Sequence, residues 1–140
     1  MDQQLLDAYL SAEYRVEEVP VPFALRVGCG SEALRALHVT CGVSCSAFLT
    51  AYNPGSRPQS EAWNRAAQDR MEADLAREGF ALRRGVGLDP SGEWPGEASV
   101  LALGVPREAA ELIGRRYGQN AVVWSDVGGI PELLVLSRAG

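Results

Sequence analysis

Two separated stretches of the chain carry side chains that can bind a small polar molecule. Amides and hydroxyls donate and accept hydrogen bonds, and a guanidinium adds a planar cation that suits carboxylate and phosphate groups. The start of a helix adds backbone N–H groups, which favour an anion. We therefore predict a ligand-binding site formed by Thr50, Asn53, Ser56, Arg57, Asn64, Gln119 and Asn120.

The same side chains also have a purely structural interpretation. Asn53 and Ser56 are typical of a tight turn around Pro54 and Gly55. Asn64 could satisfy buried backbone groups, because most side-chain hydrogen bonds in proteins go to the backbone or to water. Ligand binding and turn building are therefore alternative interpretations of this cluster.

A second group of residues is acidic. It comprises Asp89, Glu93 and Glu97, with Trp94 between the last two. Paired carboxylates can act as acid and base or bind a divalent cation. However, this spacing matches no ordered metal loop, and the start of the segment has the composition of a turn. Glu97 precedes a strand that we expect to be buried, so its carboxylate needs a partner, for which Arg83 or Arg84 is the simplest candidate.

Cysteine and histidine offer a third hypothesis, a zinc site. The ligand types are suitable, and the residues are Cys29, His38, Cys41 and Cys45. Zinc ligands usually come in closely spaced pairs, which this spacing lacks. We expect reduced thiols that pack as small apolar groups, and no metal or other cofactor. A single histidine and the lack of a Gly-x-Ser-x-Gly motif argue against a serine hydrolase.

Hydrophobic periodicity and turn residues predict the elements that position these groups. In the first third of the chain we expect a helix over 3–13, a strand over 21–27, and a helix between Ser31 and Gly42. The next expected elements are a strand over 44–53, a long helix from Ser60 to Gly79, and strands over 80–86 and 99–105. A helix over 106–117 and strands over 119–124 and 131–136 complete the prediction, with the last two strands paired as a hairpin.

The order of elements from 44 to 124 predicts an α+β fold with a ferredoxin-like βαββαβ core. We expect a single domain over 1–140, in which 1–42 form an N-terminal helical and strand extension packed on the core. The core covers 43–124, and 125–140 add a C-terminal extra strand. In the usual strand order, 4-1-3-2, we expect the first and third strands to be parallel and central. Asn53 should then lie near Gln119, whereas Glu97 should lie at the opposite edge.

Composition excludes several classes of protein. The 140 residues include 13 Arg plus Lys against 18 Asp plus Glu, and the net charge is −5. This balance argues against a nucleic-acid partner, because phosphate contacts need clustered positive charge. No apolar run approaches the length of a membrane span, and the first residues lack the pattern of a signal peptide. We therefore expect a cytoplasmic protein with no membrane contact.

Five motifs occur in a consistent order between roughly residues 45 and 125. They are Thr50-Ala51-Tyr52-Asn53-Pro54-Gly55-Ser56, Asn64, Gly85-Val86-Gly87, Trp94-Pro95-Gly96-Glu97-Ala98-Ser99 and Tyr117-Gly118-Gln119-Asn120-Ala121. In these motifs the chain resembles an uncharacterised bacterial family known only as a domain of unknown function. The resemblance implies a shared fold and marks the motif residues, but it implies no activity, substrate or cofactor.

These observations predict a small soluble domain that acts as a non-catalytic binding or regulatory module. Its partner would be a small polar or anionic ligand, another protein, or a second copy of the chain. The alternative is a small enzyme that acts on a nucleotide or phosphorylated metabolite, with Arg57 holding the anion and Glu97 or Asp89 as general base. That alternative requires a carboxylate to reach Arg57, and the predicted topology places them at opposite edges of the sheet. The sequence leaves open the identity of the ligand and the oligomeric state.

Overall fold

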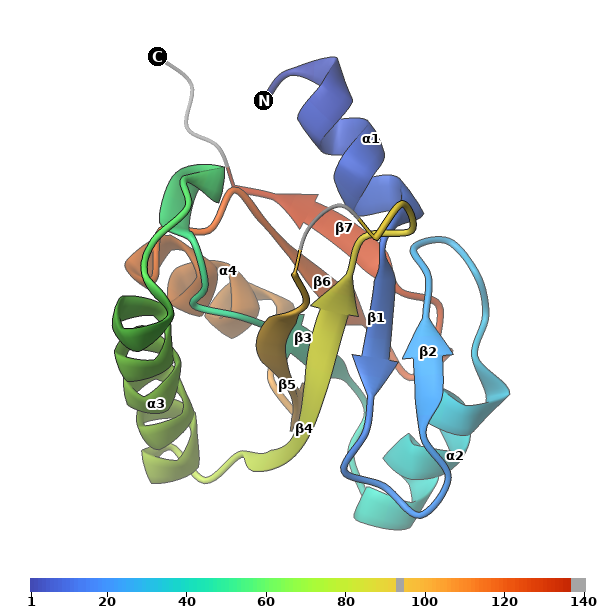
Figure 1. The fold of residues 1–140 in the computed structure, drawn as a ribbon. Coiled ribbons are helices and arrows are strands. Elements are labelled where there is room, and N and C mark those ends of the chain that lie inside the picture. Colours follow the sequence, from blue (N-terminus) through green and yellow to red (C-terminus); the bar gives the residue numbers. More distant parts are fainter. Residues whose placement is uncertain (93–94, 137–140) are drawn as a thin grey trace.

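The computed structural model describes residues 1–92 and 95–136 (Figure 1). Glu93 and Trp94, which belong to the acidic group of the sequence analysis, lie outside the described residues. The described residues form a mixed α+β structure of four helices and seven strands. The helices are α1 (Gln3–Ser11), α2 (Glu32–Cys41), α3 (Glu61–Arg77) and α4 (Arg107–Arg116). The strands are β1 (Glu13–Val16), β2 (Phe23–Leu25), β3 (Ser46–Leu49), β4 (Ala81–Leu88), β5 (Glu97–Leu103), β6 (Ala121–Ser125) and β7 (Glu132–Val135). None of the described helices has the length and apolar character needed to cross a membrane.

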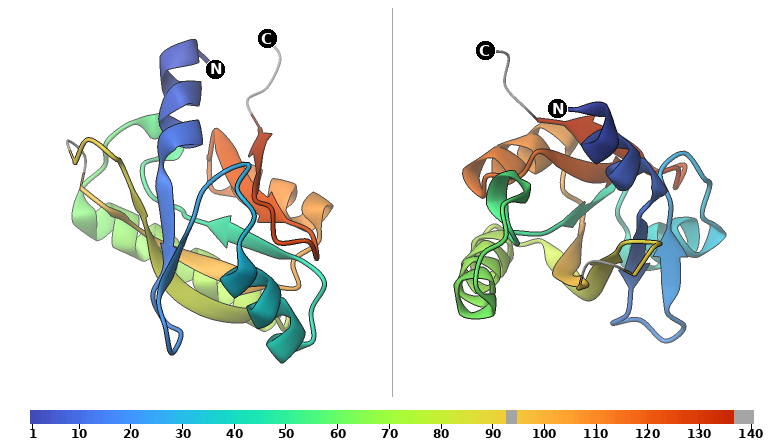
Figure 2. Two further views of the ribbon diagram at one scale, coloured as in Figure 1. Left: turned by 90° about the vertical axis from the view of Figure 1, so that its right-hand side faces the viewer. Right: turned by 45° about the horizontal axis from the view of Figure 1, so that its top comes forward.

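All seven strands join one curled sheet in the order β2-β1-β4-β5-β3-β6-β7, and every neighbouring pair is antiparallel (Figure 2). The predicted neighbours β3 and β6 do pair, with Phe48 opposite Val123. The predicted parallel pairing of the first and third core strands is wrong, because β3 and β5 are antiparallel with Phe48 opposite Leu101. Helix α3 connects β3 to β4 so that these two strands run in the same direction. β5 is antiparallel to β4, and it is therefore antiparallel to β3 as well.

The two faces of the sheet are covered by different helices. Side chains alternate along a strand, so Ala47 and Leu49 of β3 face one core and Phe48 faces the other. The first core lies under α3 and α4 and includes Met71, Leu75, Val100, Ala102, Ala110, Ile113 and Val122. The second core lies under α2 and includes Tyr14, Val16, Leu25, Leu34, Leu101 and Val123.

Local signals in the sequence correctly predict where α2 and α3 begin and where α2 ends, whereas α1 ends at Ser11 and α3 at Arg77, each two residues before the predicted end. Ser31 caps α2 by accepting a hydrogen bond from the backbone N–H of Leu34 at 3.1 Å, and Gly42 ends the helix in the left-handed conformation. Ser60 caps α3 in the same way, with the N–H of Trp63 at 3.1 Å. These caps satisfy backbone N–H groups in the first turn and so fix where each helix begins.

One strand is absent from the prediction. β1 pairs with β2 on one side and with β4 on the other, and it extends β4 to Leu88 where we predicted a loop. The backbones of β1 and β4 approach closely at Gly85, where an added Cβ would lie 2.2 Å from the carbonyl oxygen of Arg15. Glycine is therefore required at this point of the sheet.

Candidate functional site

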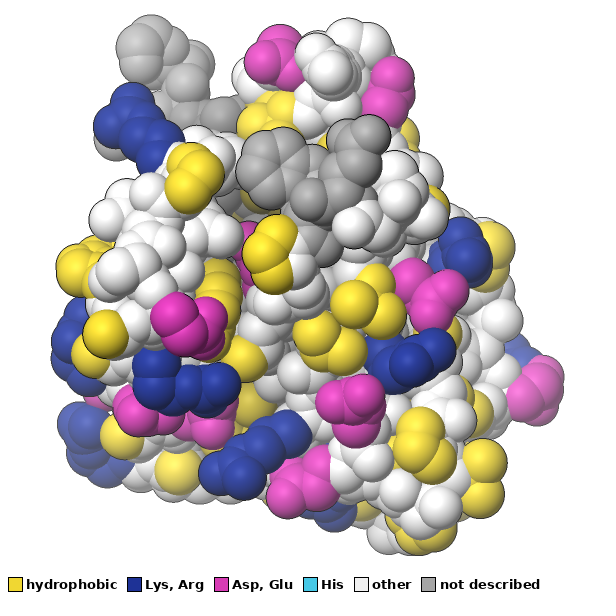
Figure 3. Space-filling view, viewed as in Figure 1, with side chains coloured by type: hydrophobic (Ala, Val, Ile, Leu, Met, Phe, Trp, Pro, Cys, Tyr) yellow, Lys and Arg dark blue, Asp and Glu magenta, His cyan; other side chains and the backbone are white. Residues whose placement is uncertain are grey.

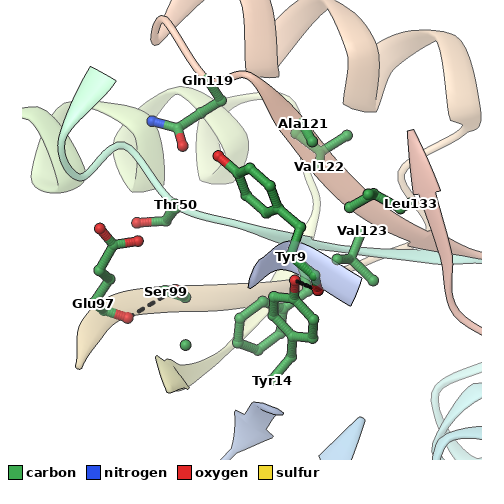
Figure 4. Close-up of a pocket in the computed structure, with 12 residues that line it drawn as sticks. Tyr9, Tyr14, Thr50, Glu97, Ser99, Gln119, Ala121, Val122, Val123 and Leu133 are labelled. Atoms are coloured by element: carbon green, nitrogen blue, oxygen red, sulfur yellow. Dashed lines mark hydrogen bonds between the residues drawn. The ribbon is translucent and has the colours of Figure 1, made fainter. Parts of the chain in front are cut away.

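A cavity of about 50 Å³ lies on the face of the sheet that α2 partly covers, and the curl of the sheet wraps strands around it (Figure 4). This space holds a few water molecules or a ligand group of similar size. The cavity is lined by Tyr9, Tyr14, Phe48, Thr50, Gly87, Glu97, Ser99, Gln119, Ala121, Val122, Val123 and Leu133. These residues come from α1, from six of the strands, and from the segments next to β3 and β6.

Small side chains keep this part of the sheet hollow. Gly87 has no side chain, and a Cβ added there would have only the hydroxyl of Ser99 within 4.0 Å. Ala121 contributes a methyl group on β6. By contrast, α2 fills the neighbouring part of the same face with Leu34, which is fully buried. The cavity is therefore the section of the curled sheet that α2 leaves uncovered.

Glu97 is the acidic residue among the described residues of the lining. Its Oε2 accepts a hydrogen bond from the Nδ2 of Asn53 at 2.8 Å. Burial raises the pKa of the Glu97 carboxyl above its ordinary value, and the hydrogen bond from Asn53 opposes that shift. No ion pair forms with Glu97 among the residues that the structure describes. The carboxyl group is thus held in place but is not neutralised by any basic side chain of residues 1–92 and 95–136.

The predicted surroundings of Glu97 are wrong in two respects. Neither predicted arginine is its partner: the guanidinium of Arg83 donates to the carbonyl oxygen of Leu82, and the backbone N–H of Arg84 donates to Glu18. Glu97 also lies at the same edge as Asn53, because β5 runs antiparallel to β3 and therefore begins where β3 ends.

Asn53 is held by a second asparagine. The backbone N–H of Asn53 donates to the Oδ1 of Asn64 at 2.9 Å, and the Nδ2 of Asn64 donates to the Oδ1 of Asn53 at 2.8 Å. Asn53 has a positive φ of 46°, which asparagine tolerates better than most residues. Because its Oδ1 is bound by Asn64 and by the backbone N–H of Gln59, its Nδ2 is left to face Glu97. Asn64 itself is buried and acts by positioning Asn53.

Two other predicted residues line the cavity. Thr50 donates its hydroxyl hydrogen to the carbonyl oxygen of Ala98 at 2.8 Å, which links the end of β3 to the start of β5. Gln119 donates from Nε2 to the carbonyl oxygen of Tyr52 at 3.1 Å, and its side chain points toward the cavity in Figure 4. Both residues therefore combine a structural hydrogen bond with a position at the cavity wall.

The remaining predicted residues lie outside the lining. Asn120 donates to the hydroxyl oxygen of Ser56 at 3.0 Å, so these two residues link the 53–57 and 117–120 segments. Arg57 is exposed and does not line the cavity. The structure thus brings the predicted amides and hydroxyls together, but it does not place the predicted cation among them.

Two tyrosines of the N-terminal segment were not predicted as site residues. The ring of Tyr9 projects from α1 into the cavity, and its hydroxyl lies 3.5 Å from that of Ser56 (Figure 4). Burial raises the pKa of Tyr9, whereas the hydrogen bond with Ser56 lowers it. Tyr14 donates its hydroxyl hydrogen to the carbonyl oxygen of Tyr9 at 2.6 Å, which ties β1 to the end of α1. The sequence could have indicated this role, because Tyr9 lies on the apolar stripe of α1 and its hydroxyl needs a hydrogen-bond partner when the ring is buried.

The zinc site considered from the sequence is not formed by the described residues. His38 and Ser46 share a hydrogen bond of 2.8 Å between Nε2 and Oγ, but both are buried and neither lines the cavity. Within residues 1–92 and 95–136, no group of three or more His, Cys, Asp or Glu side chains is placed to hold a metal ion. Acidic and basic side chains are also mixed on the face shown in Figure 3, so that face presents no broad patch of one sign.

A protein-family model described as "Protein of unknown function (DUF3293)" matches residues 49–122. The matched range contains Thr50, Asn53, Asn64, Glu97 and Gln119, and it excludes α1 and β1. No curated protein matches the chain, and no solved structure matches it.

Proposed function

Because the chain belongs to the family described as protein of unknown function (DUF3293), we propose its function from the geometry of the cavity: it is a non-catalytic module that binds a small polar ligand. The ligand presents an amino group or another hydrogen-bond donor to Glu97. The observation that carries this proposal is a partly buried carboxyl that faces a cavity, receives one hydrogen bond from Asn53, and has no ion pair among the described residues. A donor from the ligand would compensate the loss of hydration that burial imposes on this group.

The rest of the lining supports a ligand with one polar and one apolar side. The hydroxyls of Tyr9 and Thr50 and the amide of Gln119 lie at the polar side. Phe48 and Leu133 contribute to the apolar side. This combination of apolar walls and a few placed polar groups is typical of small-molecule sites. An anionic ligand fits the cavity less well, because the lining carries an acid and the exposed Arg57 lies outside it.

A thermal-shift screen tests the proposal. Methylamine and ethanolamine are the probes, with acetate and inorganic phosphate as anions of similar size. At a hundredfold excess over its dissociation constant, a bound amine should stabilise the fold by about 2.7 kcal/mol. Glu97→Gln should abolish the shift because it removes the charge, and Gly87→Val should abolish it because its side chain occupies the cavity.

Arg57→Ala is the matched control, since Arg57 is exposed outside the lining. Its amine-induced shift should equal that of the unsubstituted protein. The proposal fails if neither amine raises the melting temperature, or if the shift persists unchanged in both cavity variants.

An enzyme that acts on a nucleotide or phosphorylated metabolite is the second candidate. Its support is that Glu97, a candidate general base, shares an edge of the sheet with Asn53, and that burial raises its pKa as acid–base catalysis requires. Product formation from a panel of such metabolites, abolished in Glu97→Gln, would favour this candidate over binding alone. No product with any metabolite would leave the binding module as the better interpretation.

We further infer that the segment from β3 to β6 is a ferredoxin-like core. The order of its strands in the sheet, β4-β5-β3-β6, supports this description, as does the placement of α3 and α4 on one face. In this interpretation β1 and β2 extend the sheet at one edge and β7 extends it at the other.

A further inference from the structure

A second hollow lies on the opposite face of the sheet, between α3 and the segment that follows α4. This cleft has a volume of about 450 Å³, which is in the usual range for small-molecule sites. It is lined by Ala51, Pro54, Trp63, Ala67, Arg70, Arg116, Tyr117 and Gly118. None of these residues lines the cavity that contains Glu97.

Small residues and a close backbone contact create the cleft. Ala51 and Ala67 are buried at its floor and contribute only methyl groups. Gly118 has a positive φ of 71° and packs on Pro54, where an added Cβ would lie 2.7 Å from the proline ring. The backbone N–H of Gly55 donates to the carbonyl oxygen of Gly118 at 2.8 Å, which fixes one wall.

Two aromatic side chains line the cleft. Trp63 lies on the same stripe of α3 as the buried Ala67 and Met71, yet 44% of its surface is exposed. Tyr117 is held in place because its hydroxyl donates to Asp74, and burial together with this bond raises its pKa to about 12. The exposed indole thus offers a flat apolar surface beside a fixed aromatic ring.

Two guanidinium groups lie in the same lining. Arg116 forms an ion pair with Asp74 at 3.6 Å, which partly offsets its charge. The side chain of Arg70 is exposed, and its guanidinium forms neither an ion pair nor a hydrogen bond with any residue that the structure describes. Over α3, at the left of Figure 3, basic and hydrophobic side chains lie next to one another with acidic ones among them. Arg70 is therefore available to a ligand, beside the partly offset charge of Arg116.

We propose that this cleft binds a small anion that carries a flat aromatic ring. The ring packs on Trp63, and the anionic group lies between Arg70 and Arg116. Guanidinium groups bind carboxylates and phosphates with similar planar geometry, so the ligand class includes aromatic carboxylates and nucleoside phosphates. The cleft is separate from the cavity that contains Glu97, because the two linings share no residue and carry opposite charge.

Nuclear magnetic resonance of the Trp63 indole N–H tests the proposal, with the signal assigned by its loss in Trp63→Phe. AMP and 1-naphthoate are the two anionic probes, adenosine supplies a ring without charge, and inorganic phosphate supplies charge without a ring. We expect saturable shifts with AMP, with 1-naphthoate or with both, and weaker binding of adenosine and inorganic phosphate. A response to AMP alone identifies a phosphate ligand, and a response to 1-naphthoate alone identifies a carboxylate.

Variants on the surface of the helix distinguish the cleft from unspecific binding. Arg70→Gln should weaken the anionic probe roughly fivefold or more, because it removes one charge-assisted contact. Arg65→Gln, an exposed arginine of the same helix outside the lining, should change the affinity by less than about twofold. Gly87→Val, which blocks the other cavity, should leave the affinity for the anionic probe unchanged. The two binding proposals can therefore be disproved separately. Three results would overturn the proposal: no probe shifts the indole signal to saturation, adenosine binds as tightly as AMP does, or Arg70→Gln leaves the affinity for the anionic probe unchanged.

Discussion

The side-chain amide of Asn53 donates a hydrogen bond of 2.8 Å to the carboxyl group of Glu97, although 44 positions separate the two residues. Two features produce this contact. The start of β5 lies beside the end of β3, and Asn64 holds the Asn53 side chain in one orientation. The consequence is that a partly buried carboxyl has a fixed position at the wall of a cavity, so its protonation contributes to the pH dependence of the free energy of unfolding.

Glu97→Gln should make the stability of the protein less dependent on pH. Burial raises the pKa of Glu97 above its ordinary value of 4.5, so the folded state holds this proton more tightly than the unfolded state. The free energy of unfolding therefore falls as the pH rises from 4.5 through the raised pKa. We expect Glu97→Gln to be more stable than the unsubstituted protein at about pH 7 and similar to it below about pH 4, measured by urea denaturation.

Glu17→Gln is the control for this experiment. Glu17 lies on the exposed segment between β1 and β2 and does not line the cavity. Its substitution removes one surface carboxylate away from the cavity, and the effect of Glu97→Gln is compared with it. If Glu97→Gln is instead less stable at neutral pH, the charged form of Glu97 must be favoured by folding, and burial is not the dominant effect.

Asn64→Ala should destabilise the fold by about 1–3 kcal/mol, which is the usual cost of leaving a buried polar group without a partner. The substitution removes the acceptor for the backbone N–H of Asn53 and one of the two donors to its Oδ1. Asn64 is only 3% exposed, so water cannot readily replace the lost bonds. Urea denaturation measures the change in the free energy of unfolding.

Gln59→Ala provides the comparison for Asn64→Ala. The side chain of Gln59 is exposed, and its backbone N–H, which donates to Asn53, is retained in alanine. The expected change is within about 0.5 kcal/mol. Equal costs for the two variants would mean that the side chain of Asn64 is not what holds Asn53.

Much of the fold can be predicted from local signals. Ser31 and Ser60 cap the helices as expected, and the i+4 spacing of Ala67, Met71 and Leu75 correctly places α3 on the sheet. The proximity of the 50–57 and 117–120 segments follows from strand order, and the hydrogen bond between Ser56 and Asn120 agrees with it. These features are predictable because each depends on periodicity, a cap, or a connection rule.

The cavity depends on contacts that local signals do not specify. Glu13–Val16 alternates polar and apolar residues, but only Ala12 separates it from α1, so no turn marks the start of β1. Tyr9 reaches the cavity because β1 anchors the end of α1 to the sheet, which is a nonlocal contact. The hollow itself requires small residues on several strands at once, including Gly87 and Ala121. The position of Glu97, by contrast, follows from the direction of the β4–β5 pair and could have been inferred from the order of elements.

Two glycines of β4 should respond differently to alanine. At Gly85 a Cβ would lie 2.2 Å from the carbonyl oxygen of Arg15 and 3.1 Å from the ring of Phe48, so Gly85→Ala forces β1 away. We expect a loss of about 1–3 kcal/mol or more in the free energy of unfolding. At Gly87 a Cβ would meet only Ser99, at 4.0 Å, and would otherwise point into open space. Gly87→Ala should therefore be neutral or slightly stabilising, and similar losses for both variants would contradict the close approach of β1 and β4.

The four tyrosines should resist ionisation in the folded protein. Burial is the largest cause in each case: it raises the pKa of Tyr52 and Tyr117 from 10.0 to about 12, and it also raises the pKa of Tyr9 and Tyr14. Hydrogen bonds to Glu61 and Asp74 add to the shifts of Tyr52 and Tyr117 respectively. At about pH 10.5 the folded protein should show little tyrosinate absorbance, whereas the protein in concentrated urea should show more than half of its tyrosines ionised.

Because the folded state keeps protons that the unfolded state loses above pH 10, the free energy of unfolding should fall as the pH rises from 10 toward 12. Tyr117→Phe removes one of the four contributions, so its free energy of unfolding should fall less steeply over this range. It should be less stable near neutral pH, because Asp74 loses the hydrogen bond from Tyr117. Urea denaturation at several alkaline pH values measures both effects. Tyrosinate absorbance with a midpoint near pH 10 in the folded protein would show that the phenol groups are hydrated, and that neither Tyr9 nor Tyr14 is enclosed by the sheet.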